Sequence, residues 1–257
     1  MRIPLSDRLT ACCKFINSGD RVADVGCDHG YLSIYLVQRN ICQKVIAMDV
    51  RKGPLARAAQ TIERFGCENV VETRLSDGIQ KLALGEADGF VCAGMGGRLV
   101  LQILHRDKEK VACMKQVILQ PQSELWLVRR MLSRWGMEIE TERMVFEEGK
   151  FYPMMRIRPN AAFANAEPVC DEKFLTRFEQ GDLKLYAEEL YGKLLLEEKN
   201  EVLKEYLNRE ERLRQDVLSV LSGQDTENAR MRRESLHREF SLIEEARKRM
   251  ETEKEVL

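Results

Sequence analysis

Short apolar runs alternate with amphipathic segments of helical length over residues 1–158, and no other feature of the chain constrains its fold as strongly. Strands are expected at residues 21–25, 44–50, 69–75, 87–93 and 115–121, and helices at residues 5–16, 30–39, 53–65, 96–106 and 123–135. Strands that alternate with helices of this length form βαβ units and a mostly parallel sheet. Residues 137–149 and 150–159 follow each other without a helix, so we expect them to close the sheet as an antiparallel pair.

A segment with a proline at each end, residues 159–168, separates this α/β part from a region of different composition. Beyond it, the Ser-Gly-Gln-Asp-Thr break at residues 222–226 divides two stretches in which apolar residues recur at helical spacing. These residues are Leu203, Tyr206, Leu213, Val217 and Val220 in the first stretch and Ala229, Leu236, Phe240, Ile243 and Met250 in the second. Two long helices with a short break favour an antiparallel hairpin of the coiled-coil type. We therefore predict two domains, residues 1–160 and residues 161–257.

The composition excludes several classes of protein. Of 257 residues, 44% are apolar and 32% are charged, which is typical of a folded chain rather than a disordered one. No apolar run approaches the ~20 residues of a membrane span, and the N-terminus has no secretory apolar core, so we predict a cytoplasmic protein without membrane contact. The eight cysteines include no C-x-x-C pair, so we expect reduced thiols and no metal site.

The loop after the first expected strand, Gly-Cys-Asp-His-Gly at residues 26–30, indicates what the sheet binds. Parallel sheets bind ligands at the carboxyl ends of their strands. A dinucleotide site needs G-x-G-x-x-G, whose middle glycine lets the backbone approach a pyrophosphate, whereas here Cys27 and Asp28 occupy that space. Asp24 places a further negative charge before the loop. Because carboxylates repel phosphates and attract cations, the loop favours a positively charged ligand.

The next two strand ends favour a nucleoside. Asp49 ends the second strand 23 residues after Gly26, about the spacing at which an acidic residue binds ribose hydroxyls in this architecture. The third strand is followed by Ser-Asp-Gly at residues 76–78, where a carboxylate or backbone group can meet an adenine edge. A ribose, an adenine and a cation together match S-adenosylmethionine. The strand ends make Asp24, Gly26, Asp28, Asp49, Ser76, Asp77 and Gly78 candidates for binding this cofactor.

The fourth strand runs into Ala-Gly-Met-Gly-Gly at residues 93–97, and this loop limits the acceptor. Its glycines allow the backbone to approach a ligand closely. Methyltransferases that act on exocyclic amines of bases usually carry Asn/Asp-Pro-Pro-aromatic at this position. The loop here offers neither an aromatic ring for stacking nor an Asn side chain for the amine. Transfer to an exocyclic amine is therefore disfavoured, and transfer to a ring nitrogen remains open.

Five segments, DVGCDHGYL, MDVRKGPL, SDGI, AGMGG and LQPQ, resemble in order and spacing the bacterial tRNA (adenine(22)-N1)-methyltransferases of the TrmK family. The resemblance covers essentially the whole chain. It implies a Rossmann-like class I methyltransferase domain with a C-terminal coiled-coil domain, S-adenosylmethionine as cofactor, tRNA as partner, and N1-methyladenine at adenine 22 as product. It also implies that Asp28 and Tyr31 lie nearest the target base. The residues around the cofactor would then be Asp24, Gly26, Cys27, Asp28, His29, Gly30, Asp49, Ser76, Asp77, Gly78, Ala93, Gly94, Met95 and Gly96. Ser33 is a departure, because the family often has proline after Tyr-Leu.

A mechanism follows from the expected acceptor. Adenine N1 is a nucleophile through its lone pair, so neither a metal nor an obligatory base is required. We expect Asp28 to supply negative potential where positive charge forms on the base, and Tyr31 to stack on the adenine or hydrogen-bond to it. His29 either shapes the loop or only satisfies backbone groups.

Several basic residues are candidates for phosphate contacts of a docked tRNA. They are Arg2, Arg8, Lys14, Arg51, Arg57, Arg129, Arg130 and Arg134 in the first domain, and Arg230, Arg232, Arg233 and Arg238 in the hairpin. The hairpin either clamps RNA or serves self-association. Two alternative functions stay open: a methyltransferase of another RNA position or of a small molecule, with the hairpin used for dimerisation, and a non-catalytic RNA-binding protein with a relict crevice.

Overall fold

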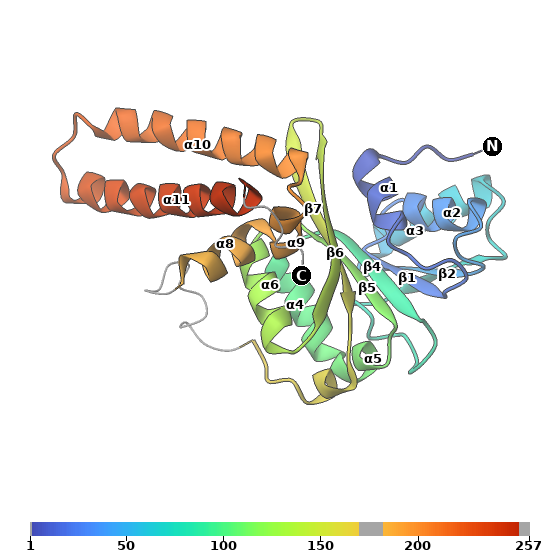
Figure 1. The fold of residues 1–257 in the computed structure, drawn as a ribbon. Helices are drawn as coiled ribbons and strands as arrows, with labels where there is room; N and C mark the ends of the chain where they lie inside the picture. The colour runs from blue at the N-terminus through green and yellow to red at the C-terminus, as the bar shows by residue number, and fades with distance from the viewer. Residues whose placement is uncertain (1, 170–181, 252–257) are drawn as a thin grey trace. The chain divides into compact units, whose positions relative to one another are not determined.

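A seven-stranded sheet is the framework of the first of two units, Met1–Glu172, in this computed structural model, which describes residues 2–169 and 182–251. The strands are β1 (Val22–Val25), β2 (Val45–Asp49), β3 (Val71–Leu75), β4 (Gly89–Met95), β5 (Gln116–Pro121), β6 (Glu138–Glu147) and β7 (Lys150–Arg158), in the order β3-β2-β1-β4-β5-β7-β6 (Figure 1). Strands β1 to β5 pair in parallel, and β7 pairs antiparallel with both β5 and β6. The predicted sheet is confirmed. Its chain order reverses between β1 and β4, which is where such sheets bind ligands.

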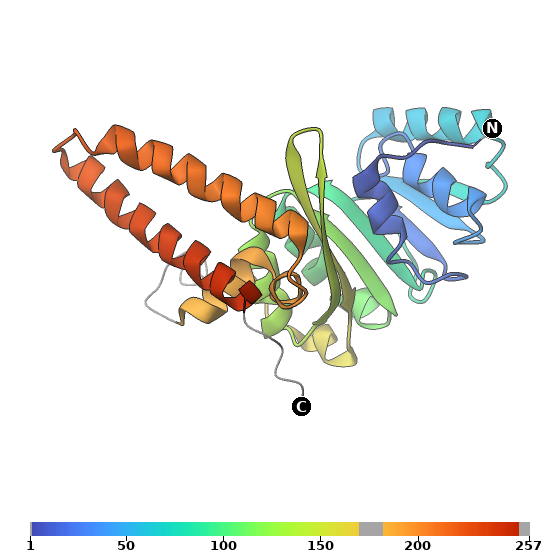
Figure 2. The ribbon, with the colours of Figure 1, turned by 45° about the horizontal axis from the view of Figure 1, so that its top comes forward.

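Helices cover both faces of the sheet. Helices α1 (Asp7–Cys13), α2 (Tyr31–Gln38) and α3 (Lys52–Arg64) pack on one face, and α4 (Gly97–Arg106), α5 (Lys108–Ala112) and α6 (Leu125–Arg134) pack on the other (Figures 1 and 2). All except the short α5 coincide with predicted helices. Within residues 2–169 and 182–251, no helix has both the length and the apolar character that crossing a bilayer requires.

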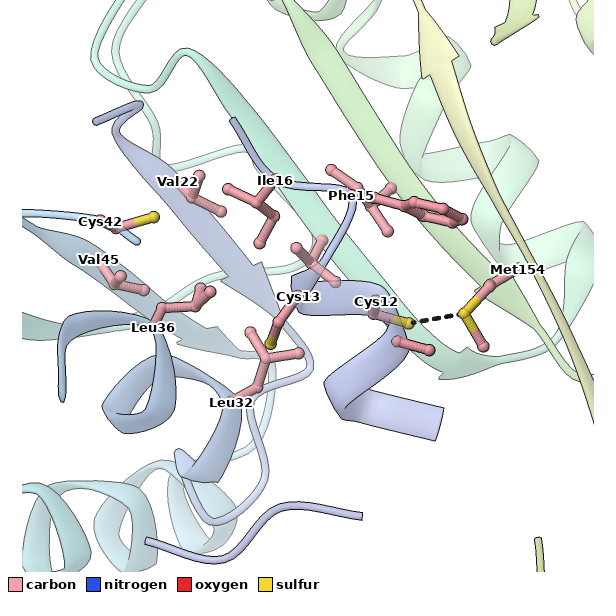
Figure 3. Close-up of a cluster of buried hydrophobic side chains, with 13 residues drawn as sticks. Cys12, Cys13, Phe15, Ile16, Val22, Leu32, Leu36, Cys42, Val45 and Met154 are labelled. Carbon is pink, nitrogen blue, oxygen red and sulfur yellow. Dashed lines mark hydrogen bonds between the residues drawn. The ribbon is translucent and has the colours of Figure 1, made fainter. Parts of the chain in front are cut away.

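Two cysteines of α1 are part of the core beneath α1 and α2. Figure 3 shows Cys12 and Cys13 among apolar side chains that include Leu32 and Val22. The Cys12 Sγ atom lies 3.9 Å from Met154 Sδ. Burial raises the pKa of Cys12 to about 12, so this thiol stays protonated and acts as a small hydrophobe.

The segment with a proline at each end packs on the first unit. Residues Ala161–Asn165 form a short 3-10 helix, η1, whose Phe163 is fully buried. The Trp135 indole N–H donates to the Glu167 carbonyl at 2.9 Å, and Lys108 Nζ donates to the Ala166 carbonyl at 2.8 Å. The division between the units therefore falls after Glu172 rather than at residue 160, where the sequence placed it.

The second unit, Lys173–Leu257, contains α8 (Leu183–Tyr191), α9 (Lys193–Glu197), α10 (Glu201–Leu221) and α11 (Glu227–Glu251). Helices α10 and α11 run side by side in opposite directions in both views (Figures 1 and 2), so the predicted hairpin is present. Leu203 and Leu236 of the predicted apolar stripes are buried between helices. In contrast, Leu213, Val217 and Val220 are exposed, so the second half of the α10 stripe does not pack within the unit. Regular coiled-coil packing along the hairpin stays a prediction.

Two hairpin arginines that were candidates for RNA contacts are engaged within the hairpin itself. Arg232 Nη1 donates to Glu239 Oε1 at 2.7 Å. Arg233 Nη1 donates to the carbonyls of Leu221 and Gln224 at 2.7 and 2.8 Å, where α10 ends. Because the last carbonyls of a helix lack intrahelical partners, Arg233 caps α10.

Asp24 links β1 to α2 beneath the first loop. Its carboxylate is buried and accepts hydrogen bonds from the Ser33 hydroxyl, at 2.7 Å, and from the Ser33 backbone N–H. Proline at position 33 could donate neither bond, so the departure from the family pattern gives this chain a connection of its own. Burial raises the pKa of Asp24 from 3.8 to about 6, and the bonds from Ser33 limit the rise.

This raised pKa predicts a pH-dependent stability. Between pH 4 and 6 the folded state keeps the Asp24 proton that the unfolded state has lost, so the stabilising contribution is complete below pH 4 and is lost as the pH rises to 6. Over this pH range the free energy of unfolding falls by about 3 kcal/mol. Asp24→Asn cannot ionise, so urea unfolding at pH 4 to 7 should show the variant gaining stability over the wild type by about this amount as the pH rises.

Ser33→Ala is the matched control. It removes a donor that stabilises the charged carboxylate, so it should steepen the loss of stability over the same pH range. A stability difference between wild type and Asp24→Asn that does not vary with pH would contradict the assignment.

Candidate functional site

A cavity of about 430 Å³ opens at the carboxyl ends of β1, β2, β3 and β4. Most of the predicted cofactor residues line it: Gly26, Asp28, Asp49, Ser76, Asp77, Gly78, Ala93, Gly94, Met95 and Gly96. The wall also includes residues that the sequence did not single out for this role, namely Val25, Val50, Arg51, Leu99 and Ile103. Asp24, Cys27, His29 and Gly30 were predicted to bind the cofactor but do not line the cavity, and neither does Tyr31.

The first loop crosses from β1 over the end of β2. The backbone N–H groups of Gly26 and Cys27 both donate to the Met48 carbonyl, at 2.8 and 3.0 Å. Gly26 has a φ of +78°, and a Cβ at this position would collide with the Met95 side chain. The atom that it would meet is the end of a flexible side chain, so the left-handed backbone rather than the contact is what favours glycine here. Gly26 and Met95 both line the cavity.

Asp28 has a left-handed backbone conformation, with a φ of +48°. Aspartate tolerates this region better than most residues, but the conformation still costs energy and is typical of functional sites. Its side chain is about 60% exposed at the cavity wall, with Arg57 Nη2 at 3.3 Å from Oδ1 and His29 Nε2 at 3.7 Å from Oδ2. The His29 ring stacks on the Tyr31 ring at a centroid distance of 5.4 Å. His29 and Tyr31 thus form an aromatic pair beside the carboxylate rather than part of the cavity wall.

The second and third strand ends present carboxylates. Asp49 is buried apart from its cavity face, and its Oδ1 accepts from the Arg51 backbone N–H at 2.8 Å. Asp77 is held by Arg106 of α4, whose Nη1 donates to the Asp77 carboxylate at 2.7 Å and whose Nη2 donates to the Asp77 carbonyl at 2.6 Å. Arg106 therefore positions the loop after β3, and Leu99 and Ile103, four residues apart on the same helix, supply an apolar wall.

The glycine-rich loop after β4 serves two purposes. Gly94 and Gly96 line the cavity. Gly97 instead begins α4 next to the chain after β5, where a Cβ would lie 2.5 Å from the Ser123 carbonyl oxygen. The Gln122 backbone N–H donates to the Met95 carbonyl at 2.8 Å, which joins the two loops. One glycine of the motif thus allows close chain packing, while two leave room beside a ligand.

The charges of the cavity wall favour a cation over a phosphate. Three carboxylates, those of Asp28, Asp49 and Asp77, line the cavity together with one guanidinium, that of Arg51. In the part of the chain that the structure describes, no cluster of three or more His, Cys, Asp or Glu side chains could hold a metal ion. The wall therefore fits a nucleoside that carries positive charge in place of phosphates.

Comparisons with known proteins agree with this geometry. Residues 5–155 match the family model described as "Methyltransferase domain". The chain is 29% identical over 244 residues to the tRNA (adenine(22)-N(1))-methyltransferase of Bacillus subtilis (strain 168), and the match covers 95% of this chain and 97% of that protein.

Solved structures of two such enzymes are also similar. The B. subtilis M1A22 tRNA methyltransferase TrmK has 28% identity and a TM-score of 0.76, over 95% of this chain and 99% of that one. M. capricolum TrmK, in complex with S-adenosyl-homocysteine, has 26% identity and a TM-score of 0.73, over 96% of this chain and 97% of that one. The resemblance found in the sequence is confirmed. The methyltransferase domain family model matches more than half of this chain, so the chain belongs to that family.

Proposed function

We propose that this chain is an S-adenosylmethionine-dependent methyltransferase that forms N1-methyladenine at adenine 22 of tRNA. The observation that carries the proposal is the acidic cavity at the switch point of the sheet, in a chain similar over nearly its whole length to an enzyme of that activity. A tRNA substrate agrees with a cytoplasmic location, which we propose as well.

The residues present fit the cofactor. Gly26 lines the cavity without a side chain, in a left-handed backbone conformation that favours glycine. We assign the ribose hydroxyls to Asp49 and the adenine edge to the loop that Arg106 holds around Asp77, since both line the cavity. When bound, S-adenosylmethionine supplies an electrophilic methyl group on a sulfonium centre. The carboxylates of the wall favour that positive charge.

The acceptor needs alignment and electrostatic stabilisation more than proton transfer. Adenine N1 attacks through its lone pair, and the base becomes positively charged as the bond forms. Asp28, exposed at the cavity wall, supplies negative potential at that point. Its pair with Arg57 is solvent-exposed, and such pairs are worth at most about 1 kcal/mol. The carboxylate can therefore exchange Arg57 for a cationic base at little cost.

The phosphate contacts of tRNA are better assigned to the first unit than to the hairpin. Arg232 and Arg233 already have partners within the hairpin. Arg51 lines the cavity and Arg57 pairs with Asp28 at its wall, and both side chains are exposed, so they can reach the backbone of a strand whose base enters the cavity. The exposed apolar residues of α10 favour a second possibility for the hairpin, in which it pairs with another protein surface and the enzyme methylates a different RNA position or a small molecule.

The proposed reaction can be tested with purified protein, labelled S-adenosylmethionine and tRNA transcripts. We expect label in N1-methyladenine at position 22, and none in a transcript with guanine at that position. Label at another nucleotide, or only in small-molecule acceptors, would replace the proposal with the alternative function. Failure to methylate any acceptor would refute both.

Asp28→Asn should lower turnover much more than cofactor affinity. The variant keeps the side-chain shape and tolerates the left-handed backbone, but loses the negative charge. We expect kcat to fall about 10²-fold, with the Kd for S-adenosylhomocysteine within about threefold of wild type. Arg57→Gln is the control, since it removes the partner and leaves the carboxylate. If Asp28→Asn keeps wild-type turnover, Asp28 is structural.

Tyr31 can be tested by a pair of substitutions. If the ring stacks on the target adenine, Tyr31→Phe should keep kcat/KM for tRNA within about threefold, and Tyr31→Ala should lower it about tenfold or more. Equal losses in both variants would indicate that the hydroxyl rather than the ring contacts the base. Steady-state kinetics with varied tRNA at saturating cofactor measures the difference.

A further inference from the structure

The β6–β7 hairpin extends past the end of β5, on the edge of the sheet where the cavity opens. Leu119 of β5 pairs with Met155 of β7. Because these two strands are antiparallel, Pro121 at the end of β5 is level with Pro153. Residues 145–152 form the tip of the β6–β7 hairpin, and the three residues that each strand adds there span roughly 10 Å. In both ribbon views this tip projects past the other strands (Figures 1 and 2).

One arginine side chain connects the tip with the wall of the cavity. The Arg8 Nε atom lies 3.9 Å from the Glu147 carboxylate, and the Arg8 guanidinium lies over the Tyr152 ring, 5.3 Å from its centroid. The Nη1 atom of the same arginine lies 4.0 Å from the place that a Cβ on Gly94 would take, and Gly94 lines the cavity. The tip is therefore only one side chain away from the cavity.

The tip is also anchored in place. The Asp7 backbone N–H, where α1 begins, donates to Glu147 Oε1 at 2.6 Å. Strands β6 and β7 stay paired as far as Glu147 and Lys150, next to the turn. A side chain on the tip is thus held at a fixed position beside the cavity, which precise binding requires.

Two phenylalanines of the tip form a platform that is open to solvent. Phe146 and Phe151 are opposite each other in the β6–β7 ladder, and their ring centroids are 4.6 Å apart. Phe146 is 49% exposed, and Phe151 is half-buried. Because side chains alternate along a strand, the two rings lie on the face opposite Glu147 and Tyr152. We call this pair the Phe146–Phe151 platform.

The surroundings of the platform favour an RNA base over a protein partner. Between residues 100 and 169, all of which the structure describes, Phe146 is the only large apolar side chain that is exposed. A protein-docking surface usually needs a broader apolar patch. A single open ring suffices for a base, because every base has a flat face that stacks on an aromatic side chain. Nearby, two exposed cations, Arg143 and Lys150, outnumber one exposed carboxylate, that of Glu148.

The location indicates which base arrives there. A target adenine that enters the cavity leaves its stack, so the bases next to it lose a stacking partner. Those bases lie at the mouth of the cavity, and the platform is at the same edge of the sheet. A ring at this place can replace the lost stacking and hold the strand open.

We propose that the Phe146–Phe151 platform stacks on a base next to the target adenine of the RNA substrate. The proposal rests on the proposed function, because it requires an RNA substrate. Phe146 supplies the open ring, and Phe151 supports it from the neighbouring strand. Neither ring lines the cavity, so the platform acts on RNA binding and not on the cofactor.

Phe146→Ala should weaken tRNA binding and leave the cofactor site intact. We expect the Kd for tRNA to rise about tenfold, and the Kd for S-adenosylhomocysteine to stay within about twofold of wild type. The slope of log Kd against log salt concentration should not change, because no phosphate contact is lost. Filter binding at several salt concentrations and calorimetry measure these quantities.

Further variants separate stacking from a merely apolar contact. Phe146→Trp should bind tRNA at least as tightly as wild type, whereas Phe146→Leu should lose most of the affinity that Phe146→Ala loses. If Phe146→Leu binds tRNA as tightly as wild type, the ring does not stack and the proposal is overturned. Leu84→Ala is the matched control, since Leu84 is exposed in the loop between β3 and β4, outside the platform, and should leave tRNA affinity unchanged.

Photocrosslinking tests the contact directly. 5-Iodouridine replaces the nucleotide on one side or the other of position 22, and mass spectrometry identifies the crosslinked peptide. We expect one of the two positions to crosslink to the tip, and Phe146→Leu to abolish that crosslink. Crosslinks that lie only outside residues 145–152 would overturn the proposal.

The two proposals fail in different ways. If the wild type methylates no tRNA, the proposed function fails and the platform has no RNA to bind. If the wild type methylates adenine 22 and Phe146→Ala binds tRNA as tightly as wild type, only the platform proposal is overturned, and the tip is then left as a candidate surface for a protein partner.

Discussion

The hydrogen bonds that tie the first loop to the end of β2 determine the geometry of the whole site. Two successive backbone N–H groups, those of Gly26 and Cys27, donate to one carbonyl, that of Met48. The chain is thereby turned across the edge of the sheet, and Asp28 is held in a left-handed conformation that an unconstrained loop would leave. Parallel pairing of β1 with β4 brings Gly26 and Met95 to the same cavity.

The sequence predicts the parts of the site that follow from strand ends. Asp49, Asp77 and Gly94 could be assigned to one edge because the carboxyl ends of parallel strands meet there, and all three line the cavity. Arg106 and Leu99 could not be assigned in this way, because they lie on α4, and the position of that helix over the β3 loop depends on tertiary packing. The sequence likewise does not reveal whether an acidic residue beside a glycine-rich loop faces the ligand or the core. Asp24 is such a residue, and its carboxylate accepts from Ser33 instead of lining the cavity.

The limits between units were harder to predict than the elements themselves. Residues 159–168 have the composition of a linker, yet Phe163 is buried, and partners outside the segment bind its backbone carbonyls. In the hairpin, apolar periodicity correctly predicted α10 as a helix but overestimated how much of it is covered, since Val217 and Val220 are exposed. Periodicity reports which residues share a helix face, whereas burial depends on whether another element covers that face.

The order of charges along the sheet edge discriminates between classes of nucleotide more strongly than any single residue does. Carboxylates line the cavity at the ends of β1, β2 and β3, and each has an arginine beside it, Arg57, Arg51 and Arg106 respectively. A dinucleotide or a nucleoside triphosphate would place its phosphates next to the ribose, at the acidic part of the edge, where they are repelled. A ligand that is neutral at its adenine and ribose and cationic in its middle matches this order.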